Sequence, residues 1–373
     1  RMRVNQTSRC HRSAVMLLAG VMLLAALSAC GQATQATSSK ATAAPDLASV
    51  KTLPDPRSYD GPSTALLGDS SVRSISPAPK PSLPVTLTDV QGTKVKVTDT
   101  SRVLALDLYG TLARTVFELG LGDQLVGRSI SSDFKEIKSL PLVTHNGHEL
   151  NAESILDLDP TLVITDTSLG PWDVILQLRD AGIPVVVTDP KRSLDNVAEI
   201  TNQVAEALGV PAAGKELVDR INTESTAVKA KIAKVSAKSI AEAPRTVFIY
   251  ARGGAGVYHL FGEGTGADSL IEALGLYDVA KEIDWKGSKP LTDEGIVAAQ
   301  PDLIVMMTKG LESVGGIDGL FKRYPALAQT PAGQHRRVVD MADSEILGYG
   351  PLTPQVLNAL AVAIYAPDAV KGS

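Results

Sequence analysis

Alternating apolar and polar positions predict a β-hairpin near the start of the folded part of the chain. Val85 to Val90 and Thr93 to Thr98 alternate in this way around Gln91-Gly92, which suits a tight turn. The next predicted elements are strands over 103–108 and 184–188 and helices over 111–119 and 174–180. Strands that alternate with helices indicate a parallel α/β sheet.

The same pattern restarts after two helical stretches. Leu194 to Leu208 carries apolar residues three or four positions apart, and a second helical stretch follows from Ala213 to about Val235. The elements predicted after it are strands over 246–250 and 337–340 and helices over 269–274, 317–323 and 354–365. The chain is therefore expected to form two α/β lobes with a helical connection between them.

A stretch of sixteen residues occurs twice, 141 positions apart. LNAESILDLDPTLVIT begins at Leu150, and LTDEGIVAAQPDLIVM begins at Leu291. Each copy predicts a short helix that carries a glutamate, then a turn at a proline, then an apolar strand. The period is too long for a solenoid unit, so it indicates two similar lobes, and two lobes imply a cleft between them.

The N-terminal residues have the pattern of an export signal. Arginines at four of the first twelve positions precede an apolar run over 14–27, after which small residues lead to Cys30. This pattern predicts a signal peptide over 1–29, and a cysteine after the small residues resembles a bacterial lipobox. Acylation of Cys30 would anchor the protein to a membrane. An uncleaved membrane anchor and a plain secreted protein are the alternatives.

Composition and charge narrow the class of protein. Hydrophobic residues make up 44% and charged residues 21% of the chain, which is ordinary for a soluble globular protein. There are 36 Lys and Arg against 41 Asp and Glu, and loss of the signal removes four more positive charges. This acidic excess argues against a nucleic-acid partner. The other cysteine, Cys10, lies in the signal, so no internal disulfide is expected.

These patterns divide the chain into five segments. The stretch over 30–82 is rich in Ala, Ser, Thr and Pro, which is typical of a flexible linker. The expected segments are a signal peptide (1–29), a lipid-anchored linker (30–82), an N-terminal lobe (83–190), an interlobe helix (191–210) and a C-terminal lobe (211–367).

Two histidines stand directly before the first copy of the repeat. His145 and His148 lie in a glycine-containing loop, and loops at the edge of a lobe often carry ligand-binding residues. A histidine that hydrogen-bonds only to its local neighbours is the alternative for each. With Glu149 beside them, they lack a third ligand at a spacing suited to zinc.

A tyrosine and an arginine stand where a predicted strand runs into a glycine-rich loop. Tyr250 ends the strand, and Arg252 follows two positions later, on the same side if the chain stays extended. A nearby guanidinium favours phenolate over phenol, and a phenolate is a ligand for ferric iron. A core tyrosine beside a solvated arginine is the alternative.

Together these features resemble the substrate-binding proteins of the iron-siderophore, vitamin B12 and heme ABC importers, over about 85–365. Within that family, VTHNGHELN from Val143 and FIYARGGAG from Phe248 are similar to the heme-binding lipoproteins of hemin importers, the HmuT type. The resemblance implies a class III periplasmic-binding-protein fold: two Rossmann-like α/β lobes with parallel sheets, joined by a single long helix.

The resemblance also implies which residues hold heme in the cleft. It makes His148 the axial ligand from the first lobe, with His145 as the alternative. Tyr250 becomes the opposite ligand, with Arg252 hydrogen-bonded to its oxygen. Many relatives use a tyrosine in the first lobe, whereas the segment from Thr144 to His148 of this chain contains none. The ligand on that side therefore depends on a histidine.

Four more residues receive roles from the resemblance. Met307 and Tyr349 are further candidates for the heme pocket, with ordinary packing as the alternative. Glu153 and Glu294, at the same position in the two copies of the repeat, are expected to meet arginines of the membrane permease. The alternative for these two is a carboxylate favoured by the helix dipole.

The expected function is binding of heme and its delivery to an ABC importer, on the extracytoplasmic face of the cell membrane and without catalysis. The implied partners are the permease and ATPase subunits and heme or heme-carrying proteins. A ferric-siderophore or cobalamin carrier of the same fold is the near alternative. A metal-dependent enzyme that uses His145, His148 and Glu149, and a heme relay without a transporter, are the others.

Overall fold

The computed structural model describes residues 40–372. The predicted signal peptide, Cys30 and the first part of the predicted linker lie outside these described residues. Within 40–372, none of the helices combines the length and the apolar character that a membrane crossing needs.

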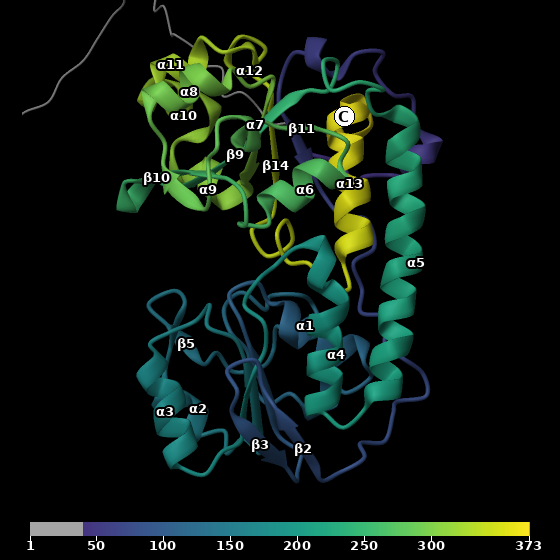
Figure 1. The fold of residues 1–373 in the computed structure, drawn as a ribbon, viewed down its shortest axis with the longest axis vertical. Helices are drawn as coiled ribbons and strands as arrows, with labels where there is room; N and C mark the ends of the chain where they lie inside the picture. Colours follow the sequence, from purple (N-terminus) through teal and green to yellow (C-terminus); the bar gives the residue numbers. More distant parts are fainter. Residues whose placement is uncertain (1–39, 373) are drawn as a thin grey trace, which may run out of the picture. The chain divides into compact units, whose positions relative to one another are not determined.

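The first lobe is built on a parallel sheet whose strands are buried along their whole length, as expected for strands covered on both faces. Its order is β4 (Val103–Leu106), β7 (Leu162–Thr165) and β8 (Val185–Val187). The helices around it are α1 (Thr111–Glu118), α2 (Ala152–Leu156), α3 (Trp172–Asp180) and α4 (Val197–Ala207) (Figure 1). Two hairpins complete it: β2 (Val85–Thr88) with β3 (Lys94–Val97), which confirms the predicted hairpin, and β5 (Thr144–His145) with β6 (Glu149–Leu150).

The second lobe contains a larger mixed sheet. Its order is β1 (Ser63–Ala65), β14 (Val338–Met341), β13 (Leu303–Met307), β9 (Arg245–Arg252), β10 (Val257–Phe261) and β12 (Ser288–Pro290), and β11 (Tyr277–Asp278) also pairs with β9. The first four strands are parallel, and β10 and β12 are antiparallel to their neighbours.

Helices cover both faces of this sheet (Figure 1). One face packs against α6 (Ala267–Ala273) and α13 (Thr353–Tyr365), and the other against α8 (Asp293–Ala299), α10 (Gly316–Arg323) and α11 (Pro325–Ala328). The remaining helices are α7 (Val279–Glu282), α9 (Thr308–Ser313) and α12 (Pro331–Gln334). The predicted α/β fold with parallel sheets in two lobes is therefore confirmed.

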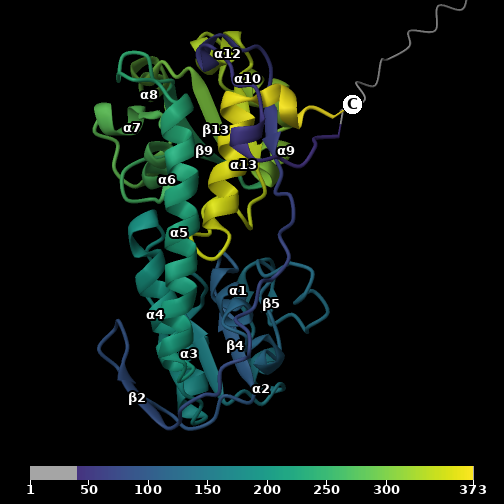
Figure 2. The same cartoon turned by 90° about the vertical axis from the view of Figure 1, so that its right-hand side faces the viewer.

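The helix that contacts both lobes is α5 (Pro211–Val235), which is 25 residues long. It packs along α4 of the first lobe and α13 of the second (Figures 1 and 2). The segment predicted as the interlobe helix, 191–210, forms a short 3-10 turn (Leu194–Asn196) and α4 instead. The buried residues of α4 pack against α1 and β2, so α4 is part of the first lobe. Amphipathic spacing shows that a helix has a buried face but not which elements cover that face.

The predicted flexible linker is wrong between Leu47 and Ala65. Leu47 is buried in a 3-10 turn (Leu47–Ser49), and Ser63 and Ala65 pair with Val339 and Met341 as an edge strand of the second lobe. This N-terminal segment, purple in Figure 2, runs beside α13. Its polar composition suggests disorder, but only a few apolar side chains need burial when a strand extends an existing sheet.

The two copies of the repeat form the same structural unit. In each copy a helix, α2 or α8, precedes a central strand, β7 or β13. Asn151 caps α2 by accepting a hydrogen bond from the Ser154 N–H (2.8 Å), and Thr292 caps α8 by accepting one from the Gly295 N–H (3.0 Å). These caps occupy equivalent positions, so the duplication extends to individual hydrogen bonds.

An arginine holds the turn after each repeat helix. Asp159 and Gln300, equivalent residues directly before the prolines, have φ values of 47° and 39°. The Nε of Arg102 donates to the Leu158 carbonyl (2.9 Å), and the Nε of Arg245 donates to the Ala299 carbonyl (3.2 Å). The two arginines lie outside the repeated stretch, so the similarity of the two copies gives no indication of them.

Candidate functional site

A cavity of about 430 Å³ is lined by residues from both lobes, which places it in the cleft. His148 and Ser131 contribute from the first lobe, and Tyr250, Arg252 and Lys309 from the second. The fold therefore brings the two predicted axial ligands, which are far apart in the chain, to the walls of one cavity.

The β5–β6 hairpin positions His148. Its turn passes through Asn146 and Gly147, which have φ values of 48° and 90°. His148 is half-buried, and its Nδ1 lies 3.3 Å from the Ser131 hydroxyl. Burial lowers the pKa of His148, and the nearby charges of Arg252 and Lys309 lower that pKa further. The lowered pKa favours the neutral imidazole, which is the form that binds metal ions.

His145 lies away from the cavity. Its side chain is exposed, and its Nε2 is 3.2 Å from the Ser154 hydroxyl in α2. His145 ends β5 and His148 follows the turn, so the two side chains have different surroundings. Of the two candidates, only His148 lines the cavity.

Tyr250 and Arg252 lie two positions apart on β9, so both project from the same side of the strand. The guanidinium carbon of Arg252 is 5.8 Å from the centroid of the Tyr250 ring. Within residues 40–372, Arg252 does not form the expected hydrogen bond to the Tyr250 oxygen. Its guanidinium lies over the Tyr250 ring instead. The predicted pairing of the two residues is present, but as a cation–π contact.

Tyr250 has aromatic neighbours on its own strand and on β10 that the sequence pattern did not single out. The ring of Phe261 on β10 stacks on Tyr250 (centroids 5.2 Å apart, planes at 13°) and on Phe248 (5.4 Å, 10°). His259 pairs directly with Tyr250 across the two strands and therefore shares its face of the sheet. The pairing of β9 with β10 could have been predicted from the sequence, because alternating residues directly after a glycine-rich turn are typical of a hairpin.

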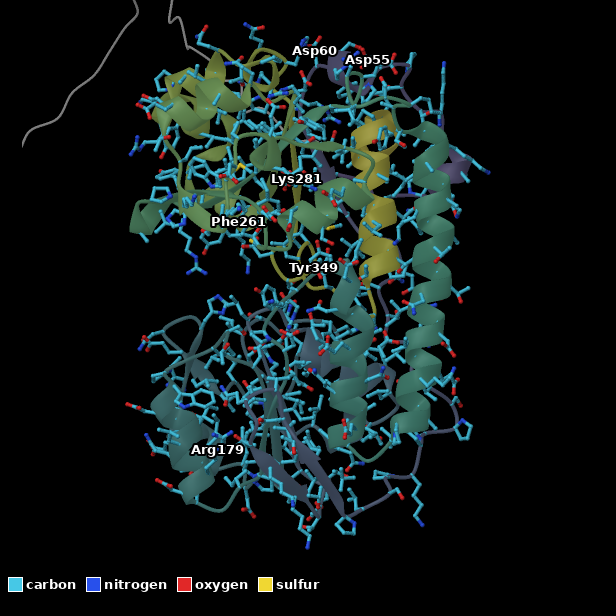
Figure 3. The ribbon with its side chains drawn as sticks, viewed as in Figure 1. Asp55, Asp60, Arg179, Phe261, Lys281 and Tyr349 are labelled. Carbon is cyan, nitrogen blue, oxygen red and sulfur yellow. The ribbon has the colours of Figure 1, made fainter. Side chains whose placement is uncertain are left out.

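Met307 and Tyr349 do not line this cavity. Met307 ends β13 and packs against the core. Tyr349 lies between the lobes (Figure 3) and lines a neighbouring cavity of about 440 Å³, which shares Ser131, Asp133 and Ser344 with the first. Its hydroxyl donates a hydrogen bond to the Gly266 carbonyl, and burial raises the pKa of this phenol. A protonated, hydrogen-bonded phenol is poorly suited to bind iron.

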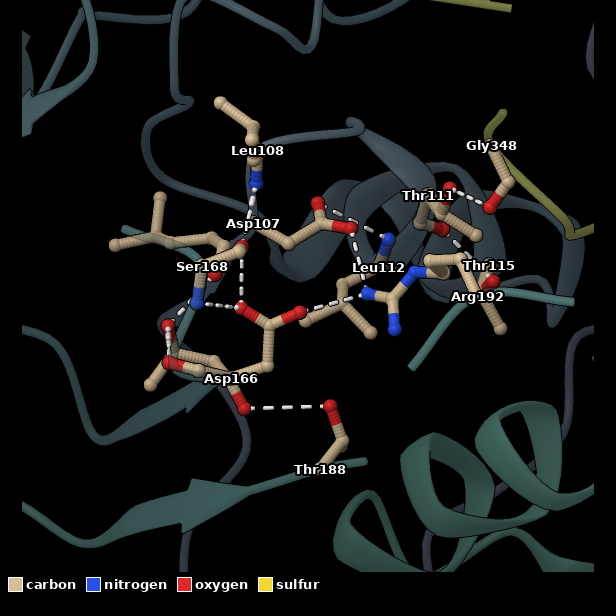
Figure 4. A network of polar contacts seen from close by, with 12 residues as sticks. Asp107, Leu108, Thr111, Leu112, Thr115, Asp166, Ser168, Thr188, Arg192 and Gly348 are labelled. Carbon is tan, nitrogen blue, oxygen red and sulfur yellow. Dashed lines mark hydrogen bonds and ion pairs between the residues drawn. The ribbon is translucent and has the colours of Figure 1, made fainter. Parts of the chain in front are cut away.

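A buried ion-pair network lies at the carboxyl ends of two first-lobe strands (Figure 4). The Nη2 of Arg192 is 3.0 Å from Asp107 Oδ2 and 2.8 Å from Asp166 Oδ2. Burial and the neighbouring Asp107 raise the pKa of Asp166 to about 6, although Arg192 opposes this shift. Two residues after Arg192, the Leu194 N–H donates to the Ser269 hydroxyl of the second lobe (3.0 Å). The network therefore lies beside a hydrogen bond that joins the two lobes.

No group of three His, Cys, Asp or Glu side chains within 40–372 is arranged to hold a metal ion. Glu149, the third member of the alternative enzyme site, lies next to the Asn146 amide (3.3 Å). His145 and His148 contact different hydroxyl groups.

Comparison with known proteins identifies the family. Residues 108–345 match the periplasmic binding protein family. The crystal structure of the heme-binding protein HmuT superimposes with a TM-score of 0.78 and 40% sequence identity, covering 83% of this chain and 99% of that protein. Structures of HmuT in which a histidine, a tyrosine or an arginine is replaced by alanine superimpose with TM-scores of 0.78 to 0.80.

Two further relatives are named for different properties, one for its transporter and one for its ligand. The ABC transporter substrate-binding lipoprotein YvrC of Bacillus subtilis is 26% identical over 291 residues, which cover 77% of this chain and 87% of YvrC. A cobalamin-binding protein of Halobacterium salinarum is 30% identical over 231 residues, which cover 60% of this chain and 58% of that protein. With its two α/β lobes and a cavity between them, the chain belongs to the periplasmic binding protein family of substrate-binding proteins and is of the HmuT type.

Proposed function

We propose that this protein binds heme in the cleft between its lobes and delivers it to an ABC importer. The observation that carries the proposal is that His148 and Tyr250 line the same cavity from opposite lobes. A histidine and a tyrosinate on opposite faces of heme would complete the coordination of ferric iron, and an anionic oxygen ligand favours the ferric state.

The cavity is lined by two cations, which can bind an anionic ligand, and by two carboxylates, Asp133 and Asp343. Heme carries two propionates, and Arg252 and Lys309 place positive charge on the cavity wall. Arg252 also lies over the ring of Tyr250, so its positive charge is close to the proposed iron ligand. The tyrosine and arginine replaced in the HmuT variants are two positions apart in that protein, the same spacing as Tyr250 and Arg252. This agreement supports the proposed roles of the two residues.

Delivery requires a membrane-bound partner. In the proposal, acylation of Cys30 holds the protein on the extracytoplasmic face of the membrane, and the cleft exchanges heme with the permease and ATPase complex without catalysis. Glu153 and Glu294 are exposed at equivalent positions in the two lobes, as contacts with two equivalent permease subunits require.

Cobalamin is the second candidate ligand. The relative from Halobacterium salinarum supports it, because that protein is a cobalamin-binding protein with 30% identity over the matched residues. Cobalamin carries neutral amides at the edge of its ring where heme carries propionates. Arg252 and Lys309 therefore favour heme, although Asp133 and Asp343 in the same lining oppose this preference.

Absorption spectra of the purified protein and three variants test the heme proposal. Tyr250→Ala and His148→Ala should each shift the heme absorption bands and weaken binding by tenfold or more, because each removes an axial ligand. His145→Ala is the matched control and should leave the spectrum unchanged. Unchanged spectra and affinities in both ligand variants would contradict the proposal. A shift with His145→Ala alone would move the ligand role to His145.

A further inference from the structure

The two repeat helices expose an apolar side chain at the same position. Leu156 in α2 is 41% exposed and Val297 in α8 is 60% exposed. The two residues are equivalent in the repeat, and each follows an exposed glutamate, Glu153 or Glu294, by three positions. Residues three apart on a helix are neighbours on its surface. Each lobe therefore presents the same pair, a carboxylate beside an apolar side chain.

The outward direction of these apolar side chains is fixed by their neighbours. The residues directly before them, Ile155 and Ile296, are fully buried and anchor the helices to the two cores. The caps and the arginine-held turns described above fix both ends of each helix in the same way in the two lobes. Leu156 and Val297 are thus held rigidly toward solvent, so a partner can bind them without ordering the helix first.

Both helices lie on the side of the molecule away from α5 (Figure 1). A single partner with two equivalent subunits could therefore contact α2 and α8 at the same time. Other exposed apolar side chains within 40–372, such as Leu176 and Ile240, have no equivalent in the other copy, because they lie outside the repeat.

We propose that Leu156 and Val297 form the apolar centres of two equivalent contacts with the permease, with Glu153 and Glu294 beside them. This inference rests on the proposed importer role. An exposed ion pair by itself contributes little affinity, whereas an apolar centre with a polar rim is typical of protein interfaces. In this proposal each permease subunit offers an apolar surface with a basic residue at its edge.

The test measures binding of the lipid-free, heme-loaded protein to the importer's permease–ATPase complex in lipid nanodiscs. Leu156→Ser and Val297→Ser should each weaken binding about tenfold, and the double variant about a hundredfold, if the two contacts act independently. Leu176→Ser and Ile240→Ser are matched controls, with exposed fractions of 44% and 73% for the replaced side chains. Both controls should bind within twofold of the unaltered protein.

The outcomes separate this inference from the proposed function. Heme spectra of all variants should match that of the unaltered protein, since none of the four residues lines the cavity. If the unaltered protein binds the complex but the two repeat variants bind equally well, or the controls lose as much, the apolar contacts are wrong and the importer role stands. Unaltered protein that binds heme but not the complex would overturn both the importer role and the contacts.

Discussion

Lys309 and His148 show how single side chains can set the ligand preference of the cleft. Both line the cavity, and the charge of Lys309 contributes to the lowered pKa of His148. The backbone N–H of Lys309 donates to Asp343 Oδ1 (2.9 Å), which fixes the start of α9 at the cavity wall. A cation on the same cavity wall as a histidine suits a ligand with a metal at its centre and a carboxylate at its edge.

Replacing Lys309 tests the preference for carboxylates. Lys309→Met should weaken heme binding about fivefold to tenfold, because a charge-assisted contact to a propionate is lost. Titration with heme dimethyl ester, which has no free carboxylate, should show little difference between the variant and the unaltered protein. Lys289→Met is the control, since Lys289 lies over the Trp285 ring outside this cavity. An equal loss of affinity for the ester would argue against propionate binding by Lys309.

At the scale of elements, β1 joins a sheet formed mainly by residues far later in the chain. It pairs with β14, and the buried Arg337 donates to the Ser63 hydroxyl (2.9 Å) and the Gly61 carbonyl (3.2 Å). Burial lowers the pKa of Arg337 to about 10, so its guanidinium is costly to bury and depends on these partners. The N-terminal strand is therefore part of the second lobe.

Removing β1 should destabilise the second lobe. A chain that begins at Gly68 lacks β1 and should unfold about 5–10 °C below a chain that begins at Lys40, because the edge of β14 loses its partner strand and Arg337 loses the Ser63 and Gly61 acceptors. A chain that begins at Asp46 keeps β1 and serves as the control. Thermal unfolding followed by circular dichroism measures all three. Equal midpoints for the Gly68 and Lys40 chains would mean that β1 contributes no stability.

At the scale of the whole molecule, the two lobes place carboxylates opposite each other. Glu345 of the second lobe and Asp133 of the first line the cavity of about 440 Å³. Burial, and then the charge of Asp133, raises the pKa of Glu345 to about 7, while Arg114 opposes the shift. A carboxyl whose pKa is higher in the folded state favours folding when protonated. Ionisation of Glu345 therefore lowers the free energy of unfolding progressively as the pH rises from about 4 to 7.

The variant Glu345→Gln tests this pH dependence. The variant should be more stable than the unaltered protein, and its advantage should be greater at pH 8 than at pH 5, by about 1–2 kcal/mol, since only the ionised carboxylate is penalised. Denaturant unfolding at the two pH values measures the difference. Glu312→Gln, at an exposed carboxylate of the same lobe, should show no such trend. An advantage that is equal at both pH values would assign the effect to packing.

The sequence by itself determined the features that depend on neighbouring residues. The apolar run at 103–108 and the apolar spacing of 111–119 and 213–235 specify a strand and two helices, because each pattern follows from local backbone geometry. The duplication of α2–β7 and α8–β13 specifies two related lobes. The spacing of Tyr250 and Arg252 places both on one side of a strand.

Tertiary structure alone decided what depends on contacts between distant segments. It distinguished His148 from His145, because the wall of the cavity is completed by the other lobe. It made α5 the helix that contacts both lobes, and it gave the N-terminal strand a partner 276 residues away, from Ser63 to Val339. Local patterns carry no information on such pairings, because the burial of a residue depends on surfaces that other parts of the chain supply.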